Sequence, residues 1–93
     1  MGLSEKDMEL LIAEISVIIN CAGTTDFNTR LDLATRTNVT GPLSLLQLAE
    51  KCGSKFQCFC QVSTCYAVCD KQGFIEERLL ESAVNWQATY EQI

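Results

Sequence analysis

The chain has 93 residues, of which 47% are hydrophobic, and its 12 acidic and 7 basic residues give a net charge of -5. This length suits one small domain, the apolar fraction is ordinary for a folded protein, and the acidic balance argues against nucleic acid as a partner. No apolar run reaches the roughly 20 residues that a membrane-spanning helix needs, because Glu14 and Asn20 interrupt the most apolar one.

The first predicted element is a short helix over residues 4–13. Ser4 with an acidic residue three positions later resembles a capping box, and apolar residues then recur at helical spacing (Met8, Leu11 and Ile12). The next element, "ISVIINCAG" over 15–23, is rich in β-branched residues and almost continuously apolar. Such a run is typical of a strand that is buried on both faces, as in a parallel sheet.

A second helical stretch is predicted to begin at or near Gly41-Pro42, because proline suits the first turn of a helix, and to end at Cys52-Gly53. The segment "KFQCFCQVST" over 55–64 predicts a second strand. Its alternation places Phe59 on one face and four apolar residues on the other: Phe56, Cys58, Cys60 and Val62. Apolar residues nearer the end of the chain would share one face of a helix, so we assign a C-terminal helix to 79–93.

The order helix, strand, helix, strand, helix predicts an α/β fold with parallel strands. Two strands are too few to form a stable sheet alone. We therefore expect residues 1–93 to be a single incomplete domain, the middle βαβ segment of a doubly wound parallel sheet.

The six cysteines are predicted to be thiols in a reducing, intracellular compartment, since the N-terminal residues do not resemble a secretory signal. We expect Cys21, Cys58 and Cys60 to act as small hydrophobic residues, because they lie in apolar runs. The chain has no histidine, and the spacing of its later cysteines matches no zinc-binding pattern. We therefore expect neither a metal site nor a disulfide framework.

Three segments together carry a resemblance to a known family: "GLSEKDMELLIAEISVIINCAGTTDFNTRLDLATRTNVTGPLSLLQLAEKC", then "VST" with Tyr66, then "QGFIEE". Over residues 2–78 the chain resembles the fatty acyl-CoA reductases, particularly the plant type. This family, with its male-sterility NAD-binding domain, belongs to the extended short-chain dehydrogenase/reductase superfamily, in which thioester reductase domains are the group most easily confused with it. The resemblance implies a Rossmann-type domain that uses NADPH to reduce a long-chain acyl-CoA to a fatty aldehyde and fatty alcohol.

The resemblance also implies a cofactor-binding role for the end of the first strand. "NCAG" matches the family's strand-end segment, which assigns Asn20, Ala22 and Gly23 to the cofactor. Asn38, within "TNVTGP", matches a helix asparagine that supports the active-site backbone or a water on the cofactor side of the site. The alternative for all four is structural, as residues that turn the chain out of a strand or lie near a helix break.

Catalytic hydroxyls are implied at the end of the second strand. "VST" over 62–64 matches the segment that carries the catalytic hydroxyl, with Thr64 as first choice and Ser63 as its neighbour. Parallel sheets bind ligands at these strand ends. Hydride transfer to the thioester carbonyl carbon creates an oxyanion, which hydroxyl donors stabilise. The alternative is that both residues only close the strand by local hydrogen bonds.

Two tyrosines compete for the role of general acid. Tyr66 precedes Lys71 by five residues, whereas the superfamily motif has four, so we assign Tyr66 to the substrate side or to packing. "NWQATYEQI" repeats the Trp-Gln-x-Thr that precedes the family's catalytic tyrosine, which matches Tyr90 to it. The lysine of that motif would lie beyond Ile93.

The chain departs from the family pattern because it contains no glycine-rich phosphate-binding loop. We therefore expect a fragment of a reductase that is inactive, or nearly so, by itself, and that is cytoplasmic or attached to a membrane through other parts. One alternative is a non-catalytic interaction module that forms homo-oligomers through exposed sheet edges. Another is a thiol-based metal or redox module.

Overall fold

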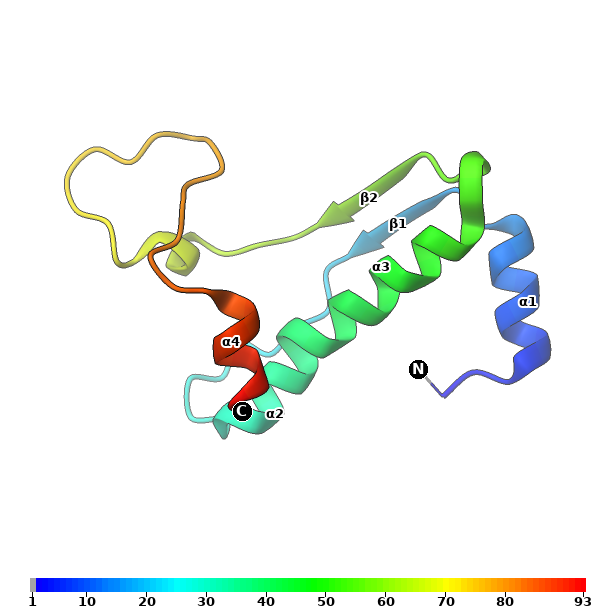
Figure 1. The fold of residues 1–93 in the computed structure, drawn as a ribbon, viewed down its shortest axis with the longest axis horizontal. Helices are drawn as coiled ribbons and strands as arrows, with labels where there is room; N and C mark the ends of the chain where they lie inside the picture. The colour runs from blue at the N-terminus through cyan, green and yellow to red at the C-terminus, as the bar shows by residue number, and fades with distance from the viewer. Residues whose placement is uncertain (1) are drawn as a thin grey trace. The chain divides into compact units, whose positions relative to one another are not determined.

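The computed structural model describes residues 2–93, which form two compact units that meet between Val62 and Ser63. The first unit contains two strands and most of the helical structure (Figure 1). Its elements, in chain order, are α1 (Glu5–Glu14), β1 (Val17–Asn20), α2 (Leu31–Thr35), η1 (Arg36–Thr40), α3 (Gly41–Cys52), η2 (Gly53–Lys55) and β2 (Cys58–Gln61). The second unit contains η3 (Cys65–Val68) and α4 (Trp86–Glu91).

Helix α1 begins where the sequence predicts. The Asp7 backbone N–H donates to Ser4 Oγ at 3.1 Å, and Ser4 Oγ in turn donates to the Asp7 carboxylate at 2.7 Å. This pair satisfies one of the backbone donors that a helix start leaves without a partner. Acidic residues in the first turn also complement the positive end of the helix dipole.

Strands β1 and β2 pair in parallel, from Val17 opposite Cys58 to Asn20 opposite Gln61. The prediction of an α/β chain with two parallel strands is therefore confirmed. Parallel neighbours need a long crossover, which the helical stretch 31–52 supplies. Because the strands run in the same direction, both carboxyl ends lie at one edge of the sheet.

The crossover is one continuous helical stretch with a π-helical turn inside it. The Gly41 N–H donates to the carbonyl of Arg36, five residues earlier, which is the spacing of a π-helix. Pro42 follows directly and has no N–H to donate. Helix α3 begins at Gly41 and ends at Cys52, so both predicted bounds are confirmed, and the helical turns before Gly41 were not predicted.

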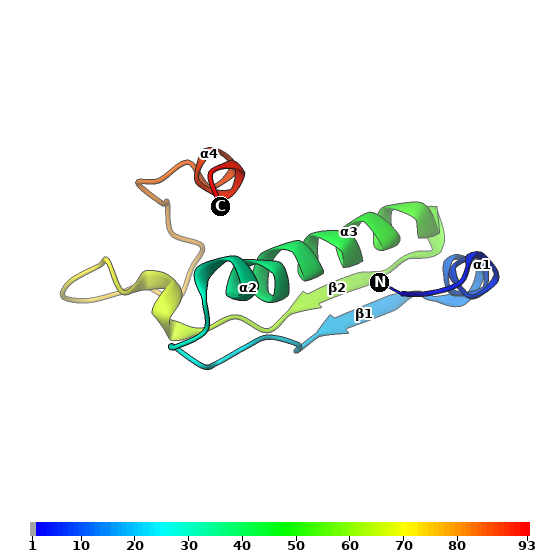
Figure 2. The same ribbon diagram turned by 90° about the horizontal axis from the view of Figure 1, so that it is seen from below.

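The hydrophobic core lies under the C-terminal half of α3, where Leu48, Ala49 and Cys52 are buried. Helix α3 contacts α1 and both strands, and it runs along one face of the sheet (Figure 2). The side chains on the opposite face are open to solvent, with Ile19 69% exposed. The prediction that β1 is buried on both faces is therefore wrong, because only one face is covered.

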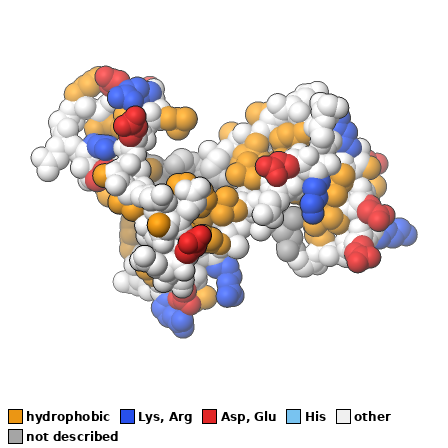
Figure 3. Space-filling model, viewed as in Figure 1, with side chains coloured by type: hydrophobic (Ala, Val, Ile, Leu, Met, Phe, Trp, Pro, Cys, Tyr) orange, Lys and Arg blue, Asp and Glu red, His pale blue; other side chains and the backbone are white. Residues whose placement is uncertain are grey.

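The uncovered face of the sheet also explains why the cysteine side chains on and directly after the strands are exposed. Cys58 and Cys60 alternate with Phe59 along β2 and are exposed, as is Cys21 after β1. The expectation that these three act as hydrophobic filler is therefore wrong. All six cysteines are free thiols, and Cys52 is the one that is buried. Other apolar side chains also reach the surface, as the orange atoms in Figure 3 show.

The second unit has little regular structure. Asn85 caps α4 by accepting the Ala88 N–H at 3.1 Å, and the rings of Trp86 and Tyr90 lie 6.4 Å apart along that helix. The expected C-terminal helix over 79–93 is thus limited to Trp86–Glu91. Leu79 is fully exposed, so the preceding residues lack the packed apolar face that stabilises most helices in proteins.

Two glycine substitutions test the helical stretch 31–52: Gly53 lies at its end and Gly41 lies within it. Gly53 has a φ of +69°, which L-residues rarely adopt, so Gly53→Ala is expected to cost about 1 kcal/mol of unfolding free energy. Gly41 has helical φ and ψ, and a Cβ there would make ordinary van der Waals contact with the Arg36 carbonyl oxygen at 3.7 Å, so Gly41→Ala is expected to stabilise by about 0.5 kcal/mol. Urea unfolding followed by circular dichroism checks both, and equal effects would contradict this account.

Candidate functional site

The carboxyl edge of the sheet is held by two side-chain amides. Asn20, the last residue of β1, is only 4% exposed, and its Nδ2 donates to Gln61 Oε1 at 2.8 Å. Its Oδ1 accepts the Ala22 backbone N–H at 3.3 Å. Both polar ends of the Asn20 amide are thus used inside the chain. This edge therefore presents the exposed residues 21–23, with the Asn20 side chain beneath them.

Asn38 holds the turn that follows β1. Its Oδ1 accepts the Thr24 N–H at 2.8 Å, and its Nδ2 donates to the Thr24 carbonyl at 3.2 Å. A Cβ on Gly23 would lie 3.1 Å from the same Oδ1, so this position accepts only glycine without a shift. Asn38 lies in the π-helical segment, a feature that often occurs at functional sites. The structure thus brings Gly23 and Asn38 together.

Gly23→Ala is expected to lower the unfolding free energy by about 1–2 kcal/mol, because the new methyl group would push the Asn38 amide away from Thr24. A double-mutant cycle with Asn38→Ala measures the effect by urea unfolding. Once Asn38 is shortened, the cost of Gly23→Ala should nearly vanish. Additive costs in the double variant would show that the two residues do not act on each other.

Ser63 and Thr64 are the first residues of the second unit, and Val62 separates them from the end of β2. Thr64 Oγ1 accepts the Tyr66 N–H at 3.2 Å and so caps η3. Both hydroxyl residues line a cavity of about 420 Å³ within this unit. Its other walls include six apolar residues: Ala67, Val68, Leu79, Leu80, Ala83 and Val84. Tyr66 is 61% exposed, and Tyr90, on α4, is not among the residues that line this cavity.

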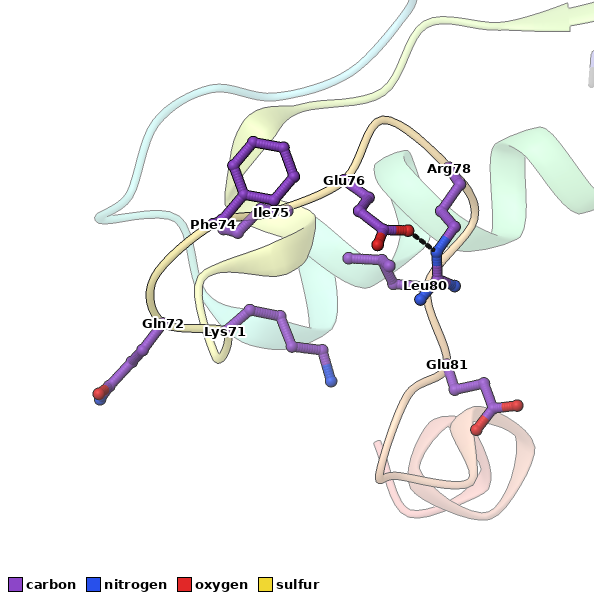
Figure 4. Close-up of a pocket in the computed structure, with 8 residues that line it drawn as sticks. All are labelled: Lys71, Gln72, Phe74, Ile75, Glu76, Arg78, Leu80 and Glu81. Carbon is purple, nitrogen blue, oxygen red and sulfur yellow. Dashed lines mark hydrogen bonds and ion pairs between the residues drawn. The ribbon is translucent and has the colours of Figure 1, made fainter.

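A neighbouring cavity of about 520 Å³ is more polar (Figure 4). Lys71 and Arg78 line both cavities. Each cation is already paired, Lys71 with Asp70 at 3.3 Å and Arg78 with Glu76, whose carboxylate points toward it in Figure 4. Acidic side chains therefore offset the charge that an anionic ligand would need.

Two further kinds of site, a metal centre and a membrane-spanning helix, were searched for along residues 2–93. Among residues 2–93, no three acidic or cysteine side chains gather closely enough to hold a metal ion. Every helix in that range is too short or too polar to cross a bilayer. Sequence reasoning missed two partners at the strand edge, Gln61 and Thr24. The signal for Gln61 was a polar residue at the end of the second strand, opposite the strand-end Asn20.

The parallel βαβ arrangement, with polar residues where both strands end, makes this an α/β protein of the parallel-sheet class, in which ligands bind at the carboxyl edge of the sheet. The model of the male sterility protein family, an NAD-binding domain, matches residues 1–92, and the chain belongs to this family. Membership confirms the family resemblance that the sequence carries. An NAD-binding domain binds a nicotinamide cofactor, so the family is one of nicotinamide-dependent proteins.

The curated relatives are fatty acyl-CoA reductases. The chain is 42% identical to fatty acyl-CoA reductase 2, chloroplastic, of Arabidopsis thaliana over 78 residues, which are 84% of the chain and 12% of the relative. It is 38% identical to fatty acyl-CoA reductase 1 of Rattus norvegicus over 72 residues, 77% of the chain and 14% of the relative. The chain thus spans about an eighth of the length of these relatives. No solved structure matches it significantly.

Proposed function

We propose that this chain contributes part of the active site of an NADPH-dependent fatty acyl-CoA reductase, which converts a long-chain acyl-CoA to a fatty aldehyde or fatty alcohol. The family match over residues 1–92 supports the reaction class. The observation that carries the proposal is the parallel register, which ends both strands at one edge of the sheet with Asn20 opposite Gln61. Ligands of open parallel sheets bind at this edge.

The cofactor side of the proposed site consists of backbone that amides hold in place. Asn20 and Asn38 act by fixing the turn, because their amide groups bond to Gln61, Ala22 and Thr24. Ala22 and Gly23 would then present exposed backbone to the nicotinamide nucleotide. These residues fit one flank of the cofactor. The phosphate cradle is not in this sequence, because its five glycines form no glycine-rich loop.

When bound, NADPH supplies the hydride. The residues of this chain would act on the acyl thioester: Thr64, with Ser63 beside it, would donate a hydrogen bond to the carbonyl oxygen as negative charge develops. Tyr90 would be the general acid, and Tyr66 would lie on the substrate side. The apolar walls of the cavity beside Ser63 and Thr64 suit an acyl chain.

Residues 1–93 would accordingly be one incomplete NAD(P)-binding domain of the Rossmann-like, doubly wound type. The uncovered sheet face supports this assignment, since such sheets carry helices on both faces. Each strand also has one unpaired edge in a sheet of two. By itself the chain is expected to show no measurable reductase activity, because the loss of acid–base and electrostatic groups typically costs factors of hundreds each.

A nuclear magnetic resonance titration tests the proposal on the chain as it exists. NADPH added to the nitrogen-15-labelled chain should shift the backbone amide signals of residues 20–24 and 62–66, with a dissociation constant in the millimolar range. NADH should shift the same signals less. Shifts confined to α1, or none at several millimolar NADPH, would refute the assignment. Thr64→Ala is the control variant for the two segments. It removes one exposed hydroxyl, so it should weaken the shifts at 62–66 and leave those at 20–24 in place.

A second candidate function is a non-catalytic interaction module that pairs with another copy of the chain. The observation that favours it is the apolar sheet face, where Val17 and Ile19 are 47% and 69% exposed. Ile19→Lys is expected to abolish self-association in sedimentation equilibrium, because a charge would have to be buried at the contact. Leu33→Lys, on α2 and 44% exposed, is the control and should leave association unchanged. A wild-type chain that stays monomeric would exclude this function.

A further inference from the structure

Asn20 is the one buried polar side chain among residues 2–93, and it belongs to a chain of hydrogen bonds that crosses the sheet edge. The Ala22 N–H donates to Asn20 Oδ1, Asn20 Nδ2 donates to Gln61 Oε1 at 2.8 Å, and Gln61 Nε2 donates to the Val62 carbonyl at 3.1 Å. The Val62 N–H closes the group by donating to the Asn20 carbonyl at 2.9 Å. We call these four residues the amide bridge.

Backbone groups at the two ends of the amide bridge fix the orientation of both side chains. A backbone N–H can only donate, so Ala22 requires an oxygen from Asn20 and turns its Nδ2 toward Gln61. A backbone carbonyl can only accept, so Val62 requires an NH₂ group from Gln61 and turns its Oε1 toward Asn20. Each side chain therefore needs one donor and one acceptor. An amide is the group that supplies both.

We propose that Gln61 is a positioning residue for the cofactor-facing turn: through Asn20 it sets the backbone at Ala22. This inference rests on the proposed function, because the turn matters for binding only if the nucleotide lies against it. Asn20 alone cannot do this, since its buried Nδ2 needs the acceptor that Gln61 provides. Gln61 also belongs to β2, so it links the turn after one strand to the end of the other.

Two substitutions separate the two hydrogen bonds that Gln61 makes. Gln61→Leu removes both the acceptor for Asn20 and the donor for Val62. Gln61→Glu keeps an oxygen facing Asn20, and it replaces the donor to the Val62 carbonyl with a second oxygen, which is free to turn toward solvent because residue 61 is exposed. Gln57→Leu is the matched control, because Gln57 is also exposed and lies just before β2, outside the amide bridge.

Amide hydrogen exchange of the labelled chain, measured with and without NADPH, tests the inference. Gln61→Leu should speed exchange at the Ala22 N–H by about tenfold, more than at the buried Leu48, and should weaken the NADPH-induced shifts at 22–23. Gln61→Glu should restore most of both, and Gln57→Leu should change neither.

The outcomes separate this inference from the proposed function. Wild-type exchange and wild-type NADPH shifts in Gln61→Leu would overturn the role of Gln61 and leave the proposed function standing. An equal increase at Ala22 and Leu48 would overturn it too, because Gln61 would then only stabilise the fold. If Gln61→Leu fails to fold, Gln61→Asn decides by the same comparison, because its side chain is one methylene shorter and carries the amide away from Asn20. An absence of NADPH shifts at 22–23 in the wild type would refute the proposed function, and the cofactor role of Gln61 with it.

Discussion

Leu48→Ala is expected to lower the unfolding free energy of the chain by about 2–5 kcal/mol, a large part of the stability that a small domain has. Leu48 is 4% exposed and lies on α3, the helix that contacts α1 and both strands. Only Ala49 and Cys52 are buried with it among the apolar residues 2–93, so Leu48 is the largest side chain of the buried core. A domain this small has a total stability near the lower end of about 5–15 kcal/mol.

Leu46→Ala is the matched control for that prediction. It makes the same change on the same helix, but Leu46 is 41% exposed, so it should cost less than about 1 kcal/mol. Urea unfolding followed by circular dichroism at 222 nm measures both variants. Similar losses for Leu46 and Leu48 would show that α3 does not bury the face that the structure assigns to it.

Local chemistry explains which parts of the fold were predictable. Ser4 and Gly53 mark helix ends by groups that act within a few residues, a capping hydroxyl and a positive φ. The π-helical turn at 36–40 was not predicted, because its Asn38 bonds to Thr24, fourteen residues away in the chain, and no local pattern shows such a contact. The uncovered sheet face was also beyond the sequence, since apolarity at Ile19 predicts burial without saying what covers it.

In the candidate site, too, local motifs were predictable and long-range contacts were not. The motif "NCAG" directs attention to Asn20, and the structure places Asn20 at the predicted strand end. Its contact with Gln61 follows from strand register, a long-range property that no single segment carries. The roles of Ser63, Thr64 and Tyr90 remain proposals from the family resemblance. Tyr90 lies on a helix of only six residues, in a unit with little regular structure.

Thiol titration is expected to give five fast-reacting cysteines and one slow one. Cys21, Cys58, Cys60, Cys65 and Cys69 are exposed free thiols. Cys52 is 6% exposed, and its Sγ donates to the Leu48 carbonyl at 3.3 Å, inside the core. It should react at least about a thousandfold more slowly, because a reagent reaches it only when the chain opens, and about 5 kcal/mol of stability allows that rarely.

The five exposed thiols make this titration informative about function as well as stability. Leu48→Ala should release Cys52 to react with the others, while Leu46→Ala should keep it slow, since only the first opens the core around it. A disulfide-exchange reagent followed by absorbance gives the count, and denaturant should bring it to six. A native count of three or fewer, restored to six by a chelator or a reductant, would favour the thiol-based metal or redox module over the reductase. A count of five would mean that the thiols at the sheet face take no part in any bond the chain makes by itself.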